Sequence, residues 1–293
     1  MLPIEELVRF GDGLDSEYRH PVAEEFATRW GTAPPKFVRS SATHVFVAAR
    51  ANEDRLVLRL RPSAAAYVLD RASQAASEWS AAGAPMVPGV ASLGGRAVET
   101  VGGYAAMALE AAEGTTLSER EDDLADHAAD WGEALARLHA ARLTSPGLPG
   151  SSDLPLPRTP EVFGTLHGDP EADNVVLTAD GPVFVDPDEV RVGWFAADVA
   201  FALRDWAAPG KAPDLSADVP RRFVDGYRRV RALSDEELSW LPMLASDAAR
   251  IELAQHQVHL RRGTLEDWPD WAVLLQRRIR DRADLLRASL GTM

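Results

Sequence analysis

The chain has 293 residues, of which 46% are hydrophobic, and a formal net charge of −14. This length allows one large or two small packed domains, and no run of roughly 18 apolar residues predicts a membrane span. The acidic balance argues against binding to nucleic acid, and the absence of cysteine excludes disulfides and thiolate metal sites. The first ten residues lack the pattern of a secretory signal, so we expect a cytoplasmic protein with no membrane partner.

The first 110 residues predict a small, mostly antiparallel β-sheet with one inserted helix. Two β-rich runs, residues 44–49 and 55–60, flank a polar turn and predict a hairpin. Residues 64–82 have the apolar stripe of a helix. The pair Gly102-Gly103 lies between two further β-rich runs, which predicts a second hairpin.

The remainder predicts a mainly helical region that contains one short β-hairpin. A long helix is expected over residues 124–138 and a last helix over roughly 271–290. The pattern therefore indicates an α+β protein with two lobes. We place a nucleotide-covering N-terminal lobe at residues 1–109 and a catalytic and substrate-binding C-terminal lobe at 110–293.

A helix is also expected around residue 250, where apolar residues have the spacing of a buried face: Trp240, Leu244, Ile251 and Val258. The sequence has no heptad pattern that would indicate a coiled-coil oligomer.

The chemistry is concentrated in residues 166–206. Phosphoryl transfer needs a carboxylate beside the attacking hydroxyl and an oxygen ligand for Mg²⁺ on one rigid loop, and Asp169 and Asn174 have the spacing of kinase catalytic loops. Asp186 ends a strand whose hairpin should return it next to Asn174. Oxygen ligands without cysteine or paired histidine fit Mg²⁺ better than zinc. Each residue alone would more often belong to a turn or a strand edge, so the prediction rests on their joint spacing.

Four short motifs together resemble the aminoglycoside phosphotransferase family, the small-molecule branch of the protein-kinase-like fold: His167-Gly168-Asp169, Asn174, Val185-Asp186 and Asp198-Val199-Ala200. The order of elements is similar over nearly the whole chain. The resemblance implies a bilobal protein-kinase-like fold, with a small antiparallel β N-lobe and a larger helical C-lobe. It also implies an ATP-dependent kinase with ATP and Mg²⁺ as cofactors.

By this resemblance Asp169 is the catalytic base or the residue that orients the hydroxyl, and Asn174 and Asp186 are the Mg²⁺ ligands. His167 is expected to brace the loop through hydrogen bonds. Asp198 is similar to the buried aspartate that anchors the catalytic loop from the following helix, although a helix N-cap role would also explain it. Asp188 could contact a second metal or stabilise a turn.

The nucleotide-covering residues follow from the same resemblance. Arg59 stands where the protein-kinase pattern has lysine, and we expect it to hold the α- and β-phosphates. Ser41 lies in a turn that takes the place of a glycine-rich loop and offers backbone N–H groups and hydroxyls. Backbone groups near Leu109 to Ala111 are expected to meet adenine.

A carboxylate partner for Arg59 is missing from the expected place. The family's helix glutamate would fall near Ala72, and the neighbouring acids Asp70 and Glu78 do not match that position.

The acceptor is expected between the catalytic loop and the C-terminal helices, where candidate residues are Glu171, Asp173, Asp205, Tyr227 and the helix at 250–262. A small molecule is the leading acceptor: an aminoglycoside-type antibiotic, an amino sugar or an amino alcohol such as homoserine. Two alternatives stay open. One is a protein Ser/Thr kinase of the stress-kinase-like type, and the other is a catalytically weak nucleotide-binding regulator, motivated by Arg59 and the missing glutamate.

Overall fold

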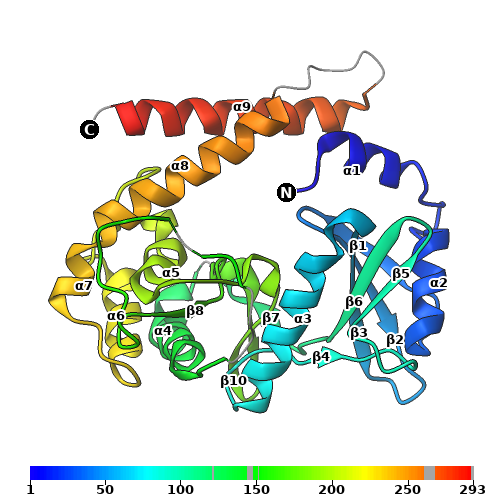
Figure 1. Cartoon of the computed structure of the whole chain (residues 1–293), viewed down its shortest axis with the longest axis horizontal. Helices are drawn as coiled ribbons and strands as arrows, with labels where there is room; N and C mark the ends of the chain where they lie inside the picture. The colour runs from blue at the N-terminus through cyan, green and yellow to red at the C-terminus, as the bar shows by residue number, and fades with distance from the viewer. Residues whose placement is uncertain (121, 144–147, 151, 261–267, 292–293) are drawn as a thin grey trace.

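The computed structural model describes the chain except for residues 121, 144–147, 151, 261–267 and 292–293. The described part forms a β-rich N-lobe and a mainly helical C-lobe, seen at the right and left of Figure 1. Helix α9 (Asp270–Gly291) packs on α8 (Leu241–Leu260) and lies along the top of both lobes in this view (Figure 1). No helix among the described residues is both long and apolar enough to cross a membrane.

The N-lobe is built on a six-stranded antiparallel sheet with the order β1-β2-β3-β6-β4, and β5 also pairs with β6. Its strands are β1 (Lys36–Ser40), β2 (His44–Ala49), β3 (Arg55–Pro62), β4 (Gly89–Val90), β5 (Val98–Val101) and β6 (Tyr104–Glu110). Its helices are α1 (Ile4–Gly11), α2 (Pro21–Trp30) and α3 (Ala66–Ala81). Both predicted hairpins and the predicted helix at 64–82 are present.

The two faces of this sheet have different partners because side chains alternate along a strand. Leu56, Leu58 and Leu60 of β3 are buried in one core with residues of α2. Arg59 projects to the opposite face, where it pairs in register with Met107 of β6. Met107 belongs to the core shared with α3 and the C-lobe, so Arg59 faces the other lobe.

The C-lobe strands are β7 (Thr115–Thr116), β8 (Phe163–Leu166), β9 (Val175–Thr178), β10 (Gly181–Phe184) and β11 (Arg191–Trp194). Its further helices are α4 (Leu124–Ala140), α5 (Phe195–Ala202), α6 (Asp218–Arg228) and α7 (Asp235–Ser239). Helices α4 and α6 make an extensive contact, and a Cβ on Gly226 would lie 1.9 Å from the carbonyl oxygen of Ala129. Only glycine permits this close approach of the two helices.

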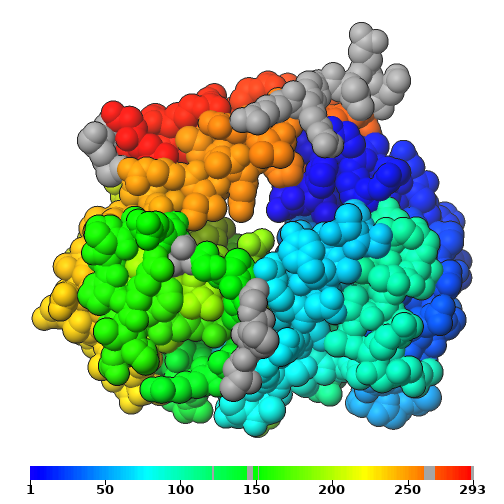
Figure 2. All heavy atoms as spheres, in the orientation of Figure 1, coloured from blue at the N-terminus to red at the C-terminus, as the bar shows by residue number. Residues whose placement is uncertain are grey.

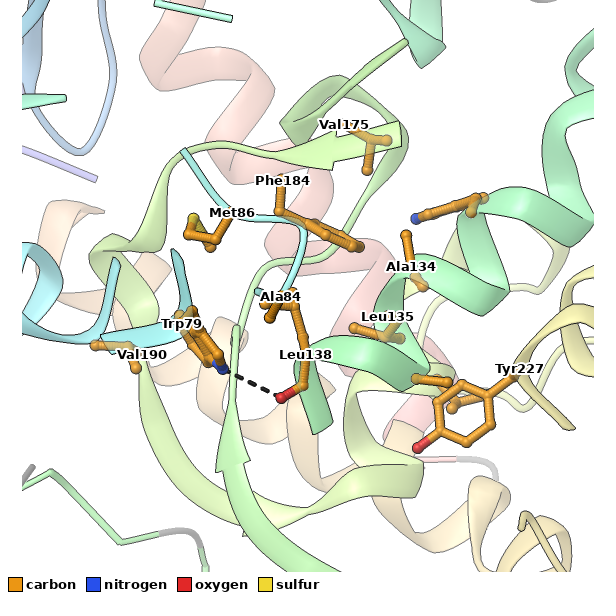
Figure 3. Packing of buried hydrophobic residues seen from close by; sticks show 14 of the residues in the cluster. Trp79, Ala84, Met86, Ala134, Leu135, Leu138, Val175, Phe184, Val190 and Tyr227 are labelled. Carbon is orange, nitrogen blue, oxygen red and sulfur yellow. Dashed lines mark hydrogen bonds between the residues drawn. The ribbon is translucent and has the colours of Figure 1, made fainter. Parts of the chain in front are cut away.

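One hydrophobic core continues from α3 into the C-lobe. The indole Nε1 of Trp79 on α3 donates to the carbonyl oxygen of Leu138 on α4 (Figure 3). Met86 forms a β-bridge with Phe184 of β10, and both side chains belong to the same cluster (Figure 3). These contacts fix α3 against the elements that carry the predicted catalytic residues.

Candidate active site

The catalytic loop connects β8 to β9 and depends on a glycine. Gly168 has φ of +88°, and a Cβ there would lie 2.1 Å from the carbonyl oxygen of Glu189. Both the left-handed backbone and the close approach require glycine between His167 and Asp169.

Asp198 anchors this loop from inside α5. Its carboxylate is fully buried and accepts hydrogen bonds from the backbone N–H groups of His167 (2.8 Å) and Gly168 (3.1 Å), and one from Nε2 of His139 (3.1 Å). Burial alone would raise the pKa of Asp198, but the hydrogen bond and charge of His139 hold it below the usual value. The alternative N-cap role is wrong, because α5 begins at Phe195, three residues earlier in the chain. Helix α5 begins before Asp198, and the Asp198 side chain makes tertiary hydrogen bonds instead of capping the helix.

His167 braces the loop, as expected. Its Nε2 lies 2.9 Å from the carbonyl oxygen of Val185, to which it donates, and its Nδ1 accepts from the backbone N–H of Asp169 at 3.3 Å. Burial lowers the pKa of His167, so the ring is neutral at pH 7 and links the catalytic loop to the strand before Asp186.

Asn174 connects the predicted base to the predicted metal site. Its Nδ2 donates to the backbone carbonyl of Asp169 (2.9 Å) and to the carboxylate Oδ2 of Asp169 (3.0 Å). Its Oδ1 is buried and has no hydrogen-bond partner. The backbone N–H of Val185 donates to the carbonyl of Asn174 (2.9 Å), which places Asp186 beside this loop, as the hairpin predicted.

Asp186 lies at the end of that hairpin in a backbone conformation that side chains rarely adopt, with φ of +61°. Aspartate tolerates this left-handed region better than most residues, and such conformations are frequent at functional sites. Its Oδ1 accepts from Nη2 of Arg59 at 2.5 Å, and its Oδ2 lies 3.7 Å from Arg39. Burial would raise the pKa of Asp186, but Arg59 holds it below the usual value.

Arg59 also binds Asp188, which resolves the question of its partner. The same Nη2 donates to Oδ2 of Asp188 at 2.8 Å, and both side chains are almost fully buried. On α3, Ala72 is buried without a polar group, Asp70 is exposed and Glu78 accepts from Gln74 instead. The ion pair of Arg59 is therefore made with the turn after β10 and not with α3.

Some of the backbone groups predicted to contact the nucleotide are already hydrogen-bonded within the protein. The N–H of Ser41 donates to Thr43 within the turn, so its hydroxyl is the group left to offer. Leu109 lies in the ladder between β3 and β4, and the N–H of Ala111 donates to Arg55. The expected N–H donor to adenine is therefore not Ala111 in this structure. The carbonyl of Ala111 and the residues after it keep that role as a prediction.

The catalytic loop opens into a cavity of about 650 Å³ whose walls also come from α5, β11 and α8. The space-filling view has a hollow between the N-lobe and α8, which is orange (Figure 2). Five carboxylates and two arginines line the cavity: Asp169, Glu171, Glu189, Asp247, Glu252, Arg191 and Arg204.

Only part of the predicted acceptor wall lies at this cavity. Glu171 lines it, and Asp205 lines a smaller neighbouring pocket. Tyr227 is buried and its hydroxyl bonds Nδ1 of His139 (2.8 Å), so it supports the core. Of the helix expected at 250–262, residues 250–260 belong to α8 and 261–262 lie outside the described residues.

Sequence reasoning missed Glu189 and Asp247, whereas Glu252 belongs to the candidate helix at 250–262. The signal on α8 was present, because the cavity-lining residues 244, 247, 248, 251, 252 and 255 recur at helical spacing. This spacing was assigned to a buried face, and that prediction is wrong at Ile251, which is 47% exposed and borders the cavity. The predicted burial is also wrong at Val258, whose side chain is 58% exposed.

Two carboxylates at the cavity have pKa values raised toward neutral pH. Burial raises the pKa of Asp169 to about 6, while Arg204 opposes the rise and Asp186 adds to it. Burial, followed by the charge of Asp169, raises the pKa of Glu171 to about 8, although Glu171 also pairs with Arg204. Raised carboxylate pKa values at the mouth of a cavity are typical of acid–base sites.

The oxygen groups around Asn174 and Asp186 fit a magnesium ion. The buried Oδ1 of Asn174 has no hydrogen-bond partner among the described residues, and the backbone of Asn174 is bonded to Val185, the residue before Asp186. The two side chains offer the oxygen ligands that Mg²⁺ prefers. Among the described residues, no group of three or more His, Cys, Asp or Glu side chains could hold a metal.

Fold and loop together define a phosphotransferase of the protein-kinase-like class. The model described as the phosphotransferase enzyme family matches residues 36–165 and 154–233, which is more than half of the chain. The chain belongs to this family, and the predicted family and enzyme class are confirmed.

A curated relative supports the small-molecule branch over a short span. The homoserine kinase of Paramagnetospirillum magneticum is 37% identical over 100 residues. The match covers 32% of this chain and only 30% of that protein.

Solved structures confirm the bilobal fold. An amicoumacin kinase solved with AMP-PNP, Ca²⁺ and Ami is similar with a TM-score of 0.73 at 15% identity, covering 96% of this chain and 95% of that one. A spectinomycin phosphotransferase solved with ADP and spectinomycin has a TM-score of 0.62 at 10% identity, covering 90% and 97%. At these identities the likeness concerns the fold.

Proposed function

We propose that this phosphotransferase moves the γ-phosphoryl group of ATP to a hydroxyl of a small molecule that carries an ammonium group. The observation that supports it most strongly is the joint placement of Asp169, Asn174 and Asp186. Asn174 holds the Asp169 carboxylate through Nδ2, and its buried Oδ1 has no hydrogen-bond partner among the described residues. Asp169 lines a cavity large enough for an acceptor.

The reaction follows from the roles of these residues. Asp169 orients the acceptor hydroxyl and takes its proton as the oxygen attacks the γ-phosphorus, while the bond to the bridging oxygen breaks and ADP leaves. Asn174 and Asp186 would hold Mg²⁺, which offsets charge on the phosphates when bound. Arg59 and the hydroxyl of Ser41 would contact the phosphates, and the segment from Leu109 past Ala111 would meet adenine. Catalysis is then mainly positioning and electrostatics.

The cavity favours a cationic acceptor. Arg204 pairs with Glu171, and Arg191 donates to the carbonyl of Gly168 (3.1 Å), so both cavity arginines are engaged by the protein. Glu189 is exposed at the cavity and makes no ion pair with another described residue. An acceptor ammonium would complete this charge, and the net charge of −14 would steer it inward.

The size of the cavity favours a small molecule over a protein substrate, because about 650 Å³ lies within the usual range for small-molecule sites. An amino sugar, an amino alcohol and an aminoglycoside-type antibiotic all have the required hydroxyl and ammonium groups. The weak-regulator alternative is less favoured, since base and metal-binding groups are all present and correctly linked.

An acceptor panel tests the proposal. ADP release and the mass of the product are measured with amino sugars, amino alcohols, aminoglycosides, their uncharged hydroxyl analogues and a Ser/Thr peptide. We expect turnover with an amine-bearing acceptor and a raised KM for it in Glu189→Gln, with Asp180→Asn on the exposed β9–β10 turn as the matched control. Turnover of the peptide alone would support the protein-kinase alternative. ATP binding without any acceptor turnover would support the regulator.

A further inference from the structure

Arg59, the buried N-lobe cation of this chain, has no charged partner on α3. The residues of α3 that face the core are Leu69, Ala72, Ser73, Ala75, Ala76 and Trp79, and none of them carries a charge. Asp70 is exposed on the other side of the helix, and Glu78 is hydrogen-bonded to Gln74. Because a buried guanidinium needs a counter-charge, the structure must provide one from elsewhere.

That counter-charge comes from the C-lobe turn η4 (Pro187–Glu189), which packs against α3. A single atom, Nη2 of Arg59, donates to Asp186 at 2.5 Å and to Asp188 at 2.8 Å. The side chains of Arg59 and Asp188 are 4% and 1% exposed. The contact thus joins strand β3 to a turn 129 residues later in the chain.

The two carboxylates have different surroundings. Asp186 belongs with Asn174 to the chain's predicted metal site, and it also lies 3.7 Å from Arg39. Asp188 forms its ion pair with Arg59, and the charge of Arg61 also acts on it. Its Oδ1 has no hydrogen-bond partner among the described residues. If Asp186 turns to a nucleotide-bound metal, Asp188 is the carboxylate that remains with Arg59.

We propose that Asp188 is the positioning residue that fixes the Arg59 guanidinium at the phosphate site, in the role that a helix glutamate has in protein kinases. Asp186 shares Arg59 in the free protein and is released when metal and nucleotide bind. The buried Nε of Arg59, which has no partner in the free protein, is then a donor available to a phosphate oxygen. This inference rests on the proposed function, because it assigns a residue that positions Arg59 at the same nucleotide site.

The arrangement has a consequence for the lobes. Since Arg59 is fixed by the C-lobe, the phosphate clamp is set by the contact of β3 with η4, and movement of α3 alone does not break it. Asp188→Asn keeps the shape of the side chain and one acceptor oxygen but removes the counter-charge, so it should misplace Arg59 without opening a cavity.

Nucleotide binding measured by calorimetry tests the proposal. For Asp188→Asn we expect affinity for ATP to fall about 10- to 100-fold, the range for a charge-assisted buried bond, while affinity for adenosine is unchanged. Asp70→Asn, the matched change on the exposed side of α3, should bind both ligands like the wild type. An equal loss for ATP and adenosine would indicate a purely structural role and overturn the proposal.

A second arm separates a role through Arg59 from a role as metal ligand. ATP binding is repeated in EDTA and with Mg²⁺, and in the Arg59→Met and Arg59→Met/Asp188→Asn proteins. The double variant removes both charges, so it keeps the test possible if Arg59→Met alone does not fold. We expect the loss of ATP affinity caused by Asp188→Asn to persist in EDTA and to vanish in the Arg59→Met background. If Arg59→Met does not fold, we expect the ATP affinity of the double variant to lie within twofold of that of Asp188→Asn.

A loss that is seen only with Mg²⁺ would assign Asp188 to the metal and overturn the inference. Unchanged ATP affinity in Asp188→Asn, with binding by the wild type intact, would overturn the inference and leave the proposed function standing. Failure of the wild type to bind ATP at all would overturn both.

Discussion

Replacing Asp198 with alanine should lower the free energy of unfolding by several kcal/mol. Asp198→Ala removes the acceptor for three buried donors: the backbone N–H groups of His167 and Gly168, and Nε2 of His139. His139 can recover by exchanging tautomers, because its Nδ1 could then donate to the hydroxyl of Tyr227, 2.8 Å away. Two backbone donors remain unsatisfied, each costing about 1–3 kcal/mol, so we expect a loss of about 2–6 kcal/mol in the free energy of unfolding.

Asp198→Asn gives an internal check on this reasoning. Its single amide oxygen can accept from one backbone N–H while its NH2 group faces Nε2 of His139, so we expect roughly half the loss of the alanine variant. Such losses are a large fraction of the roughly 5–15 kcal/mol that stabilises a domain.

Urea unfolding followed by tryptophan fluorescence measures the free energy for each variant, with Asp180→Ala on the exposed β9–β10 turn as the control. A loss below about 1 kcal/mol in Asp198→Ala would refute the account, because it would mean that the buried N–H groups find other partners.

Four further outcomes follow from the structure. The acid limb of kcat/KM against pH should have an apparent pKa of about 6, because Asp169 acts deprotonated, and Arg204→Met should move it to higher pH, since Arg204 opposes the rise; an unmoved limb would exclude Asp169 as the titrating base. Asp169→Asn should raise the melting temperature by an amount that grows between about pH 4 and 6, because a raised folded pKa makes wild-type stability fall as pH rises through that value; a constant difference would contradict this. Gly168→Ala should reduce kcat strongly, because its Cβ would displace the Glu189 carbonyl and disturb the loop that carries Asp169; wild-type kcat would be inconsistent with the strained loop. Gly226→Ala should lower stability by about 1–3 kcal/mol through separation of α4 and α6, as measured by urea unfolding; wild-type stability would show that the helices can part freely.

The placement of the three proposed active-site residues was predictable because their geometry is local. Asp169 and Asn174 lie on one loop, and a tight hairpin with register Val175↔Phe184 returns Asp186 to it. Spacing and turn residues are enough to specify such a unit.

The partner of Arg59 was not predictable from spacing. It lies 127 to 129 residues away, on a turn whose position depends on how α3 packs against the C-lobe. The acidic lining contributed by α8 has the same cause, because a helical stripe does not reveal whether it faces a core or a cavity. Asp198 is a third case. Aspartate is typical of helix starts, but Asp198 lies inside α5 and accepts hydrogen bonds from the backbone N–H groups of His167 and Gly168.

Transfer of the terminal phosphoryl group tests the central claim most directly. Labelled γ-phosphate from ATP is followed into the acceptor identified by the panel, under single-turnover conditions with Mg²⁺, for the wild type and Asp169→Asn, and ATP affinity is measured in parallel. We predict a phosphate monoester on the acceptor hydroxyl and a rate that falls about 10²- to 10⁴-fold in Asp169→Asn, with ATP affinity retained. A wild-type rate in Asp169→Asn would contradict the assignment of Asp169, Asn174 and Asp186 as the phosphoryl-transfer centre.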